Sequence, residues 1–160
     1  MKVEPQNEHA WLHRLIGDWT YEVKACMKPG EPPQKFTGTE SVRSVGGIWI
    51  VAEGQGEMPG GGMATTILTL GFDPKSGRFV GSWVGSMMTH LWVYEGTLDA
   101  AAKVLTLACE GPAFDGEETT TKYKDVHTLI SDNERTLSGN CLGKDGKWSE
   151  MMTCTYRRAR

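Results

Sequence analysis

The sequence predicts a single all-β domain over residues 1–160, in which an antiparallel meander of about 8–10 strands closes into a small barrel after a short N-terminal helix. After residue 17, apolar and polar residues alternate with period two through most of the chain, which is the pattern of half-buried strands. The composition agrees, because 20 glycines indicate many turns and 6 tryptophans favour sheet. An open meander of this length would expose edge strands, and closure into a barrel removes those edges.

The N-terminal helix is expected over about residues 7–16. Asn7 is a suitable N-cap, and Gly17 is a suitable stop at the other end. The apolar residues between them fall on one helical face: Trp11, Leu12, Leu15 and Ile16. A helix of about three turns must dock on another element to persist, so we expect it to close one end of the barrel.

Ten segments after the helix alternate as strands do, and turn residues separate them. The segments are 18–25, 35–45, 48–57, 64–72, 78–84, 89–98, 104–110, 119–130, 135–142 and 148–157. The connections carry turn chemistry, such as the Gly46-Gly47 pair, the Pro74 and Gly77 of the next turn, and the Asp145-Gly146 pair. The glycine run at 60–62 predicts a mobile flap at a barrel mouth.

Charge and hydropathy patterning exclude two classes of partner. The formal net charge of -3 gives no basic face for nucleic acid and no basic amphipathic segment for an anionic membrane. No apolar run approaches the roughly 20 residues that span a bilayer. Residues 1–10 are polar and lack the apolar core of a signal peptide. We therefore expect a cytoplasmic protein that binds neither nucleic acid nor membrane.

Neither the cysteines nor the histidines predict a metal site, and no cofactor is expected. The four cysteines are Cys26, Cys109, Cys141 and Cys154. They have no metal-binding spacing and lie in predicted strands, so we expect free buried thiols rather than disulfides. His9 and His13 have the i,i+4 spacing of a helical metal pair, but no third ligand accompanies them. We interpret them as solvated surface histidines.

The segment around His90 is the richest in chemistry. Period two places His90, Trp92 and Tyr94 on one face of a strand, and the preceding strand adds Trp83. An inward face of this kind would form a pocket with apolar walls and a few polar tips, the usual composition of a small-molecule site. Two alternatives stay open: the aromatic side chains fill the core, or they face outward as an oligomer interface.

Carboxylates and a second histidine are candidates for the polar lining of this interior. Glu40 shares a face with Phe36 and Val42, and Glu150 shares a face with Trp148 and Met152. A carboxylate inside an apolar barrel must be paired or have a raised pKa. It then acts as a general base or as the structural partner of an inward arginine. The long strand 119–130 contributes further candidates. Tyr123, Asp125 and His127 share one of its faces, and the aspartate could orient the imidazole ring.

Two ends of the chain resemble the lipocalin-like, or calycin, arrangement. Residues 11–19 run from a short helix into Gly17-Asp18-Trp19, and the last strand ends with Tyr156-Arg157-Arg158. The resemblance implies that Trp19 packs under a basic residue of the final strand. Strand parity selects Arg158 for a cation–π contact with Trp19, and the alternative is a solvated Arg158 at a frayed end.

Three further segments resemble the bacterial family DUF1579. They are Gly46-Gly47-Ile48-Trp49, Leu70-Gly71-Phe72-Asp73-Pro74, and the run from Gly81 to Gly96. The resemblance covers nearly the whole chain and implies a lipocalin-like barrel. It brings no established activity, so no catalytic residue is carried over from it.

These observations favour a small-molecule-binding barrel for an apolar or aromatic ligand. The expected lining residues are Glu40, Trp83, His90, Trp92, Tyr94, Tyr123, His127, Glu150 and Met152. One alternative is a cofactor-independent enzyme of isomerase or lyase type that uses an interior Glu or His. Another is a non-catalytic homodimer formed through a strand face that carries Trp49 or Val51. A haem ligand at His90 or His127 is a further option that the sequence does not select.

Overall fold

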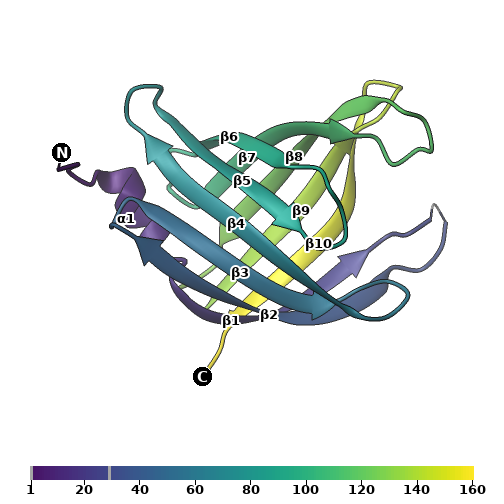
Figure 1. The fold of residues 1–160 in the computed structure, drawn as a ribbon, viewed down its shortest axis with the longest axis horizontal. Helices are drawn as coiled ribbons and strands as arrows, with labels where there is room; N and C mark the ends of the chain where they lie inside the picture. The colour runs from purple at the N-terminus through teal and green to yellow at the C-terminus, as the bar shows by residue number, and fades with distance from the viewer. Residues whose placement is uncertain (1, 29) are drawn as a thin grey trace.

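A computed structural model describes residues 2–28 and 30–160 as a closed antiparallel barrel with one short helix (Figure 1). The helix is α1 (Asn7–His13). The strands are β1 (Gly17–Ala25), β2 (Gln34–Val45), β3 (Trp49–Glu57), β4 (Met63–Asp73), β5 (Arg78–Gly85), β6 (Trp92–Leu98), β7 (Val104–Pro112), β8 (Thr120–Leu129), β9 (Glu134–Leu142) and β10 (Trp148–Arg158). Each strand pairs with its neighbours in sequence, and β1 also pairs with β10. The predicted closed meander is therefore confirmed.

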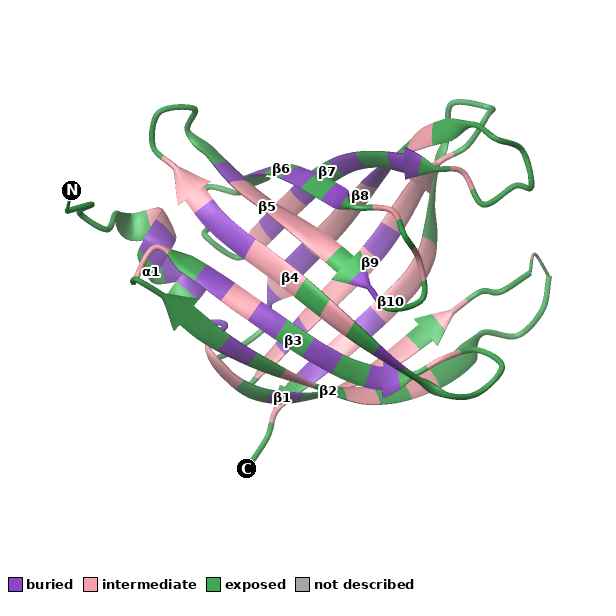
Figure 2. Ribbon diagram, in the orientation of Figure 1, coloured by how far each residue is buried: buried purple, intermediate pink, exposed green. Residues whose placement is uncertain are grey.

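Side-chain alternation follows from the register of the strands. Buried and exposed residues alternate along the strands, most clearly along β3 (Figure 2). Trp19 on β1 lies opposite Glu40 on β2 and Arg158 on β10. Next along β1, Tyr21 lies opposite Gly38. A Cβ atom at Gly38 would lie 2.3 Å from the Tyr21 ring, so glycine makes room for the tyrosine inside the barrel.

Helix α1 closes one end of the barrel, at the side where β1 begins. It packs against β3 and β4, and its Leu12 is completely buried. The indole Nε1 of Trp11 donates a hydrogen bond to the Ala102 carbonyl at 2.8 Å. Because strands alternate in direction, the connections after β1, β3, β5, β7 and β9 all lie at the other end, which we call the mouth.

The helix differs from the prediction at both ends. Its N-cap is Gln6 rather than Asn7, because the Nδ1 atom of His9 accepts a hydrogen bond from the Gln6 N–H at 2.8 Å. The helix ends at His13 rather than at residue 16. Beyond His13, the N–H groups of Leu15 and Ile16 bond to carbonyls three residues back, which tightens the chain before β1.

A seam between the ends of β1 and β10 completes the closed end. The Arg158 guanidinium lies 4.2 Å from the Trp19 ring centroid. It donates hydrogen bonds to the carbonyls of Ile16 at 2.7 Å, Arg14 at 3.1 Å and Asp132 at 2.9 Å. Gly17 has a φ of +129°, and a Cβ atom there would lie 2.5 Å from the Arg158 guanidinium. Glycine at this position therefore lets the arginine reach three carbonyls.

Two further observations bear on the expectations from sequence. All four cysteines are free, but Cys26 is exposed just beyond the end of β1 rather than buried in a strand. Within the described part of the chain, no helix is long and apolar enough to cross a membrane.

Candidate functional site

The barrel interior holds a cavity of about 320 Å³ that is partly open to solvent. Its lining combines aromatic, aliphatic and sulfur-containing side chains with a few polar groups. They are Tyr21, Val23, Glu40, Thr66, Leu68, Trp83, Met88, Trp92, Tyr94, Cys109, Phe114, Tyr123, Asp125, His127, Arg135, Leu137, Met151, Met152, Cys154 and Tyr156. This volume lies at the lower end of the range of small-molecule sites, roughly 300–1,000 Å³. The barrel interior is therefore not filled by side chains.

Aromatic rings and methionines form the wall nearest the mouth. Trp92 stands edge-on to Tyr123, with ring centroids 5.0 Å apart. Its indole N–H points to the sulfur of Met88 at 3.1 Å, and Met88 comes from the connection between β5 and β6. Phe114, from the connection after β7, also contacts this pair of rings. These contacts fix the orientation of Trp92, which lines the cavity.

A buried ion pair lies deeper in the cavity. The Arg135 guanidinium on β9 donates a hydrogen bond to the Glu40 carboxylate on β2. Their side chains are only 4% and 11% exposed. The guanidinium also lies 3.8 Å from the ring centroid of Tyr156 and 4.6 Å from that of Trp19. Glu40 is therefore held as the partner of an inward arginine, which was one of the two alternatives for it.

A second polar pair joins β6 to β8. The Tyr94 hydroxyl donates a hydrogen bond of 2.5 Å to the Asp125 carboxylate. Burial raises the pKa of both groups, and the nearby negative charge of Asp125 raises that of Tyr94 further. The expected partner of Asp125 was His127, and this prediction is wrong, because the carboxylate is engaged by a tyrosine of a different strand.

His127 is buried in the cavity wall, with 7% of its surface exposed. Burial, and then the positive charge of Arg135, lower the pKa of its imidazole to about 3. The ring is therefore neutral across the physiological range. Burial likewise raises the pKa of the Cys109 and Cys154 thiols to about 12, so neither is a thiolate near neutral pH.

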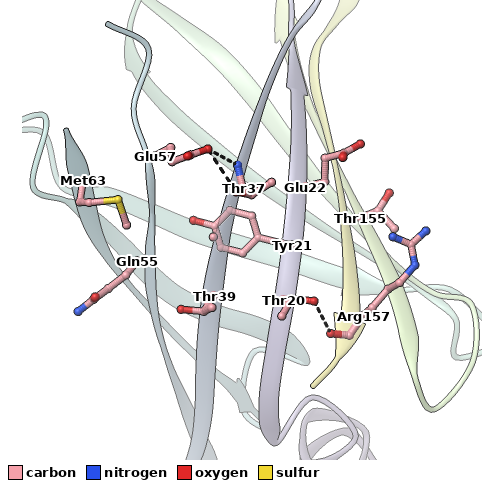
Figure 3. A pocket seen from close by; sticks show the side chains of 11 residues that line it. Thr20, Tyr21, Glu22, Thr37, Thr39, Gln55, Glu57, Met63, Thr155 and Arg157 are labelled. Carbon is pink, nitrogen blue, oxygen red and sulfur yellow. Dashed lines mark hydrogen bonds between the residues drawn. The ribbon is translucent and has the colours of Figure 1, made fainter. Parts of the chain in front are cut away.

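A separate hollow of about 560 Å³ lies on the outer face of the barrel (Figure 3). Its rim consists of exposed polar side chains from neighbouring strands, and in Figure 3 the Glu57 carboxylate bonds to the Thr37 N–H at 3.0 Å and to its hydroxyl at 3.2 Å. Although this hollow is larger than the interior cavity, it is more open to solvent. The interior cavity is the better candidate site, because ligand pockets bury most of the ligand surface.

Comparison with known proteins identifies the family. The family model of DUF1579, described as a protein of unknown function, matches residues 4–158. The chain belongs to the DUF1579 family. A search of the curated proteins finds no match.

Solved structures similar to this DUF1579 protein are also barrels. The crystal structure of Rv2717c from M. tuberculosis has a TM-score of 0.68 at 15% identity, covering 98% of this chain and 100% of that one. The structure of EF1p2_mFAP2b bound to DFHBI has a TM-score of 0.51 at 14% identity, covering 96% and 100%. The redesigned β-barrel b11L5F_LGL has a TM-score of 0.50 at 13% identity, covering 99% and 100%. At these identities the likeness concerns the fold alone.

Most of the residues predicted for the site lie around the DUF1579 cavity. Those that line it are Glu40, Trp83, Trp92, Tyr94, Tyr123, His127 and Met152. His90 does not, because β6 begins at Trp92 rather than at residue 89. Its ring stacks edge-on against Trp92 with centroids 4.7 Å apart, and its Nε2 donates to the Glu110 carbonyl at 3.3 Å.

Glu150 is exposed and does not line the cavity, so its predicted inward position is wrong. The register of β10 with β9 shifts between Glu150 and Met152, which is a β-bulge. One extra residue reverses the facing of every side chain before it. Met151 thereby joins Met152 in the cavity wall.

Arg135 is the main residue of the cavity that the sequence reasoning missed. It alternates with Leu137, Gly139 and Cys141 along β9, so period two could have placed it on the inward face. Arg135 begins the predicted strand 135–142 but is not among the residues expected to face inward, because a charged residue is rarely buried without a partner and the sequence does not show that Glu40 meets it.

The other residues considered in the sequence, His9, His13 and Trp49, lie outside the cavity lining. The interpretation of His9 as a solvated surface histidine is wrong, because the residue is buried and its Nε2 donates to the Phe72 carbonyl. His13 donates to the Gly47 carbonyl. The described residues contain no group of three or more potential metal ligands. Trp49 is 40% exposed and lies over Gly71 on the outer surface. A homodimer through Trp49 or Val51 stays a prediction, which analytical ultracentrifugation would test.

Proposed function

We propose that the barrel binds one small apolar or aromatic molecule in its interior cavity. The observation that carries this proposal is the interior cavity of about 320 Å³, partly open to solvent and walled by aromatic, methionine and aliphatic side chains. Such walls stabilise an apolar ligand by removing its surface from water. The few polar groups that face the same space would orient the ligand.

The state of the ionisable groups favours binding over acid–base or nucleophilic catalysis. A general base works best with a pKa near the ambient pH, and the pKa of His127 is far below it. The Glu40 carboxylate is held by Arg135, and burial keeps the Cys109 and Cys154 thiols protonated. The cavity therefore supports the isomerase or lyase alternative less well than the binding function.

The methionines around the mouth also support ligand entry. Met88, Met151 and Met152 line the cavity, and Met87 and Met27 are exposed in connections at the same end. Methionine side chains are flexible and polarizable, so they adapt to ligands of different shape. The EF1p2_mFAP2b barrel, which is similar in fold, is bound to DFHBI in its structure, and this supports the idea that such a barrel has room for a small molecule.

Calorimetric titration with 2-naphthol, an uncharged two-ring compound, tests the proposal. The protein is expected to bind one molecule, and the Leu68→Trp variant is expected to lose binding because the larger indole would occupy the cavity that Leu68 lines. Ile67→Trp is the matched control, because the neighbouring residue is 38% exposed on the outer face. Thermal unfolding checks that both variants fold.

Equal loss of binding in the two variants, or equal retention, would contradict an interior site. Compounds that co-purify with the protein, detected by native mass spectrometry, give an independent indication of ligand class. They should disappear in Leu68→Trp and persist in Ile67→Trp.

A further inference from the structure

The imidazole of His127 is a polar group of the cavity that the fold leaves unpaired. The other three histidines, His9, His13 and His90, each meet a backbone carbonyl, at 3.0, 3.0 and 3.3 Å respectively. No hydrogen bond joins the ring nitrogens of His127 to any group within residues 2–28 and 30–160, although the side chain is 93% buried and lines the cavity. Among the described residues, the fully buried side-chain atom without a hydrogen-bond partner is Nε of Arg135, not a nitrogen of His127. The unpaired ring nitrogens of His127 are therefore in contact with the cavity space, where a group from outside the chain can bond to them.

A neutral imidazole sets the chemistry of that partner. One ring nitrogen carries a hydrogen and donates, while the other accepts. A hydroxyl group both donates and accepts, so it matches whichever nitrogen faces the cavity. A carbonyl matches only the protonated nitrogen, and a hydrocarbon matches neither.

The other charged groups of the cavity compensate one another. The charge of the Arg135 guanidinium is compensated by Glu40, and the group lies between two aromatic rings, although its buried Nε–H has no hydrogen-bond partner among the described residues. Asp125 accepts the hydrogen bond of the Tyr94 hydroxyl. A charged ligand would therefore lose its hydration without meeting an unpaired opposite charge, which is unfavourable.

We propose that the ligand is an uncharged aromatic alcohol or phenol whose hydroxyl group hydrogen-bonds to the ring of His127. Its ring system packs against the aromatic wall formed by Trp83 and Trp92, which line the same cavity. This inference rests on the proposed binding function and adds the chemical class of the ligand and the residue that recognises it.

A series of matched two-ring compounds tests the inference at pH 7: naphthalene, 2-naphthol, 2-naphthoate and the 2-naphthylmethylammonium ion. We expect 2-naphthol to bind about tenfold more tightly than naphthalene, the increment of one good hydrogen bond. Both ions are expected to bind at least about 100-fold more weakly than 2-naphthol, because their charge is desolvated without compensation.

Two variants assign the preference to His127. His127→Phe keeps an aromatic ring but removes both polar atoms, so naphthalene and 2-naphthol should bind it with similar affinity. His127→Gln keeps a donor and an acceptor and should retain most of the preference, which a purely structural role of the histidine would not explain. His13→Gln, at the closed end, is the matched control and should leave the whole series unchanged.

The outcomes separate this inference from the proposed function. If none of the four compounds binds, the binding function itself is contradicted, and the inference with it. If naphthalene binds as well as 2-naphthol, if either ion binds most tightly, or if His127→Phe keeps the preference for the alcohol, the cavity binds ligands but the inferred class is wrong.

Discussion

The buried pair of Arg135 and Glu40 gives the strongest prediction about stability. Replacing Arg135 by Met keeps much of the side-chain volume but leaves the Glu40 carboxylate, 11% exposed, without its partner. Breaking a buried ion pair on one side costs about 3–5 kcal/mol. The variant also loses the contacts of the guanidinium with Trp19 and Tyr156, which are worth roughly 0.5–2 kcal/mol each.

The double variant Glu40→Leu/Arg135→Met isolates the pair. It leaves no unpaired charge, and replacement of a buried pair by apolar residues of similar size is often neutral or stabilising. We therefore expect the double variant to be more stable than Arg135→Met alone, with a coupling of about 2–3 kcal/mol. Urea unfolding of the four proteins at pH 7 measures the free energies, and unchanged m-values confirm that the same transition is compared.

Additive effects in this cycle would refute the reasoning. If the double variant loses the sum of the two single losses, Arg135 and Glu40 contribute independently, and the carboxylate is not held by the guanidinium. A destabilisation of Arg135→Met below about 1 kcal/mol would also contradict it, because that is typical of an exposed pair.

Three other predictions follow from single contacts. Gly38→Ala should destabilise the barrel by roughly 1–3 kcal/mol in urea unfolding, because its Cβ would overlap the Tyr21 ring; an unchanged stability would mean that the ring moves freely. Since the pKa of His127 is about 3 in the fold and about 6.5 in the unfolded chain, the unfolded state binds an extra proton between these values. Stability should therefore fall as pH drops below about 6.5, by up to about 1.4 kcal/mol per pH unit from this group, and His127→Gln should flatten that slope. Arg158→Lys should lower the melting temperature, because an ammonium cannot stack on Trp19 and reach three carbonyls together; an unchanged melting temperature would show that the seam is dispensable.

Most strands of the barrel can be predicted from the local sequence, because a strand with one face in the interior alternates inward and outward side chains. Period two is enough to place Trp19, Glu40 and Tyr94 inside, and Gly17 marks the start of β1. Period two carries no information about a bulge, so the sequence does not show that the side chain of Glu150 faces outward.

Pairing between distant strands was the second limit. The sequence suggests His127, two residues away on the same strand, as the partner of Asp125, whereas the barrel brings it Tyr94 from β6. Similarly, Glu40 meets Arg135 only because closure of the barrel faces β2 towards β9 across the interior. The sequence shows which side chains face inward, and closure decides which of them meet.

Methyl NMR of protein labelled at the methionine methyl groups, titrated with 2-naphthol, tests most directly whether the interior cavity binds a ligand. Met88, Met151 and Met152 line the cavity, whereas Met63 is 62% exposed and belongs to the outer hollow. We predict saturable shifts of the three cavity methyl groups, with the dissociation constant found by calorimetry, and no shift of Met63. Shifts confined to Met63, or shifts that grow without saturation, would contradict an interior binding site.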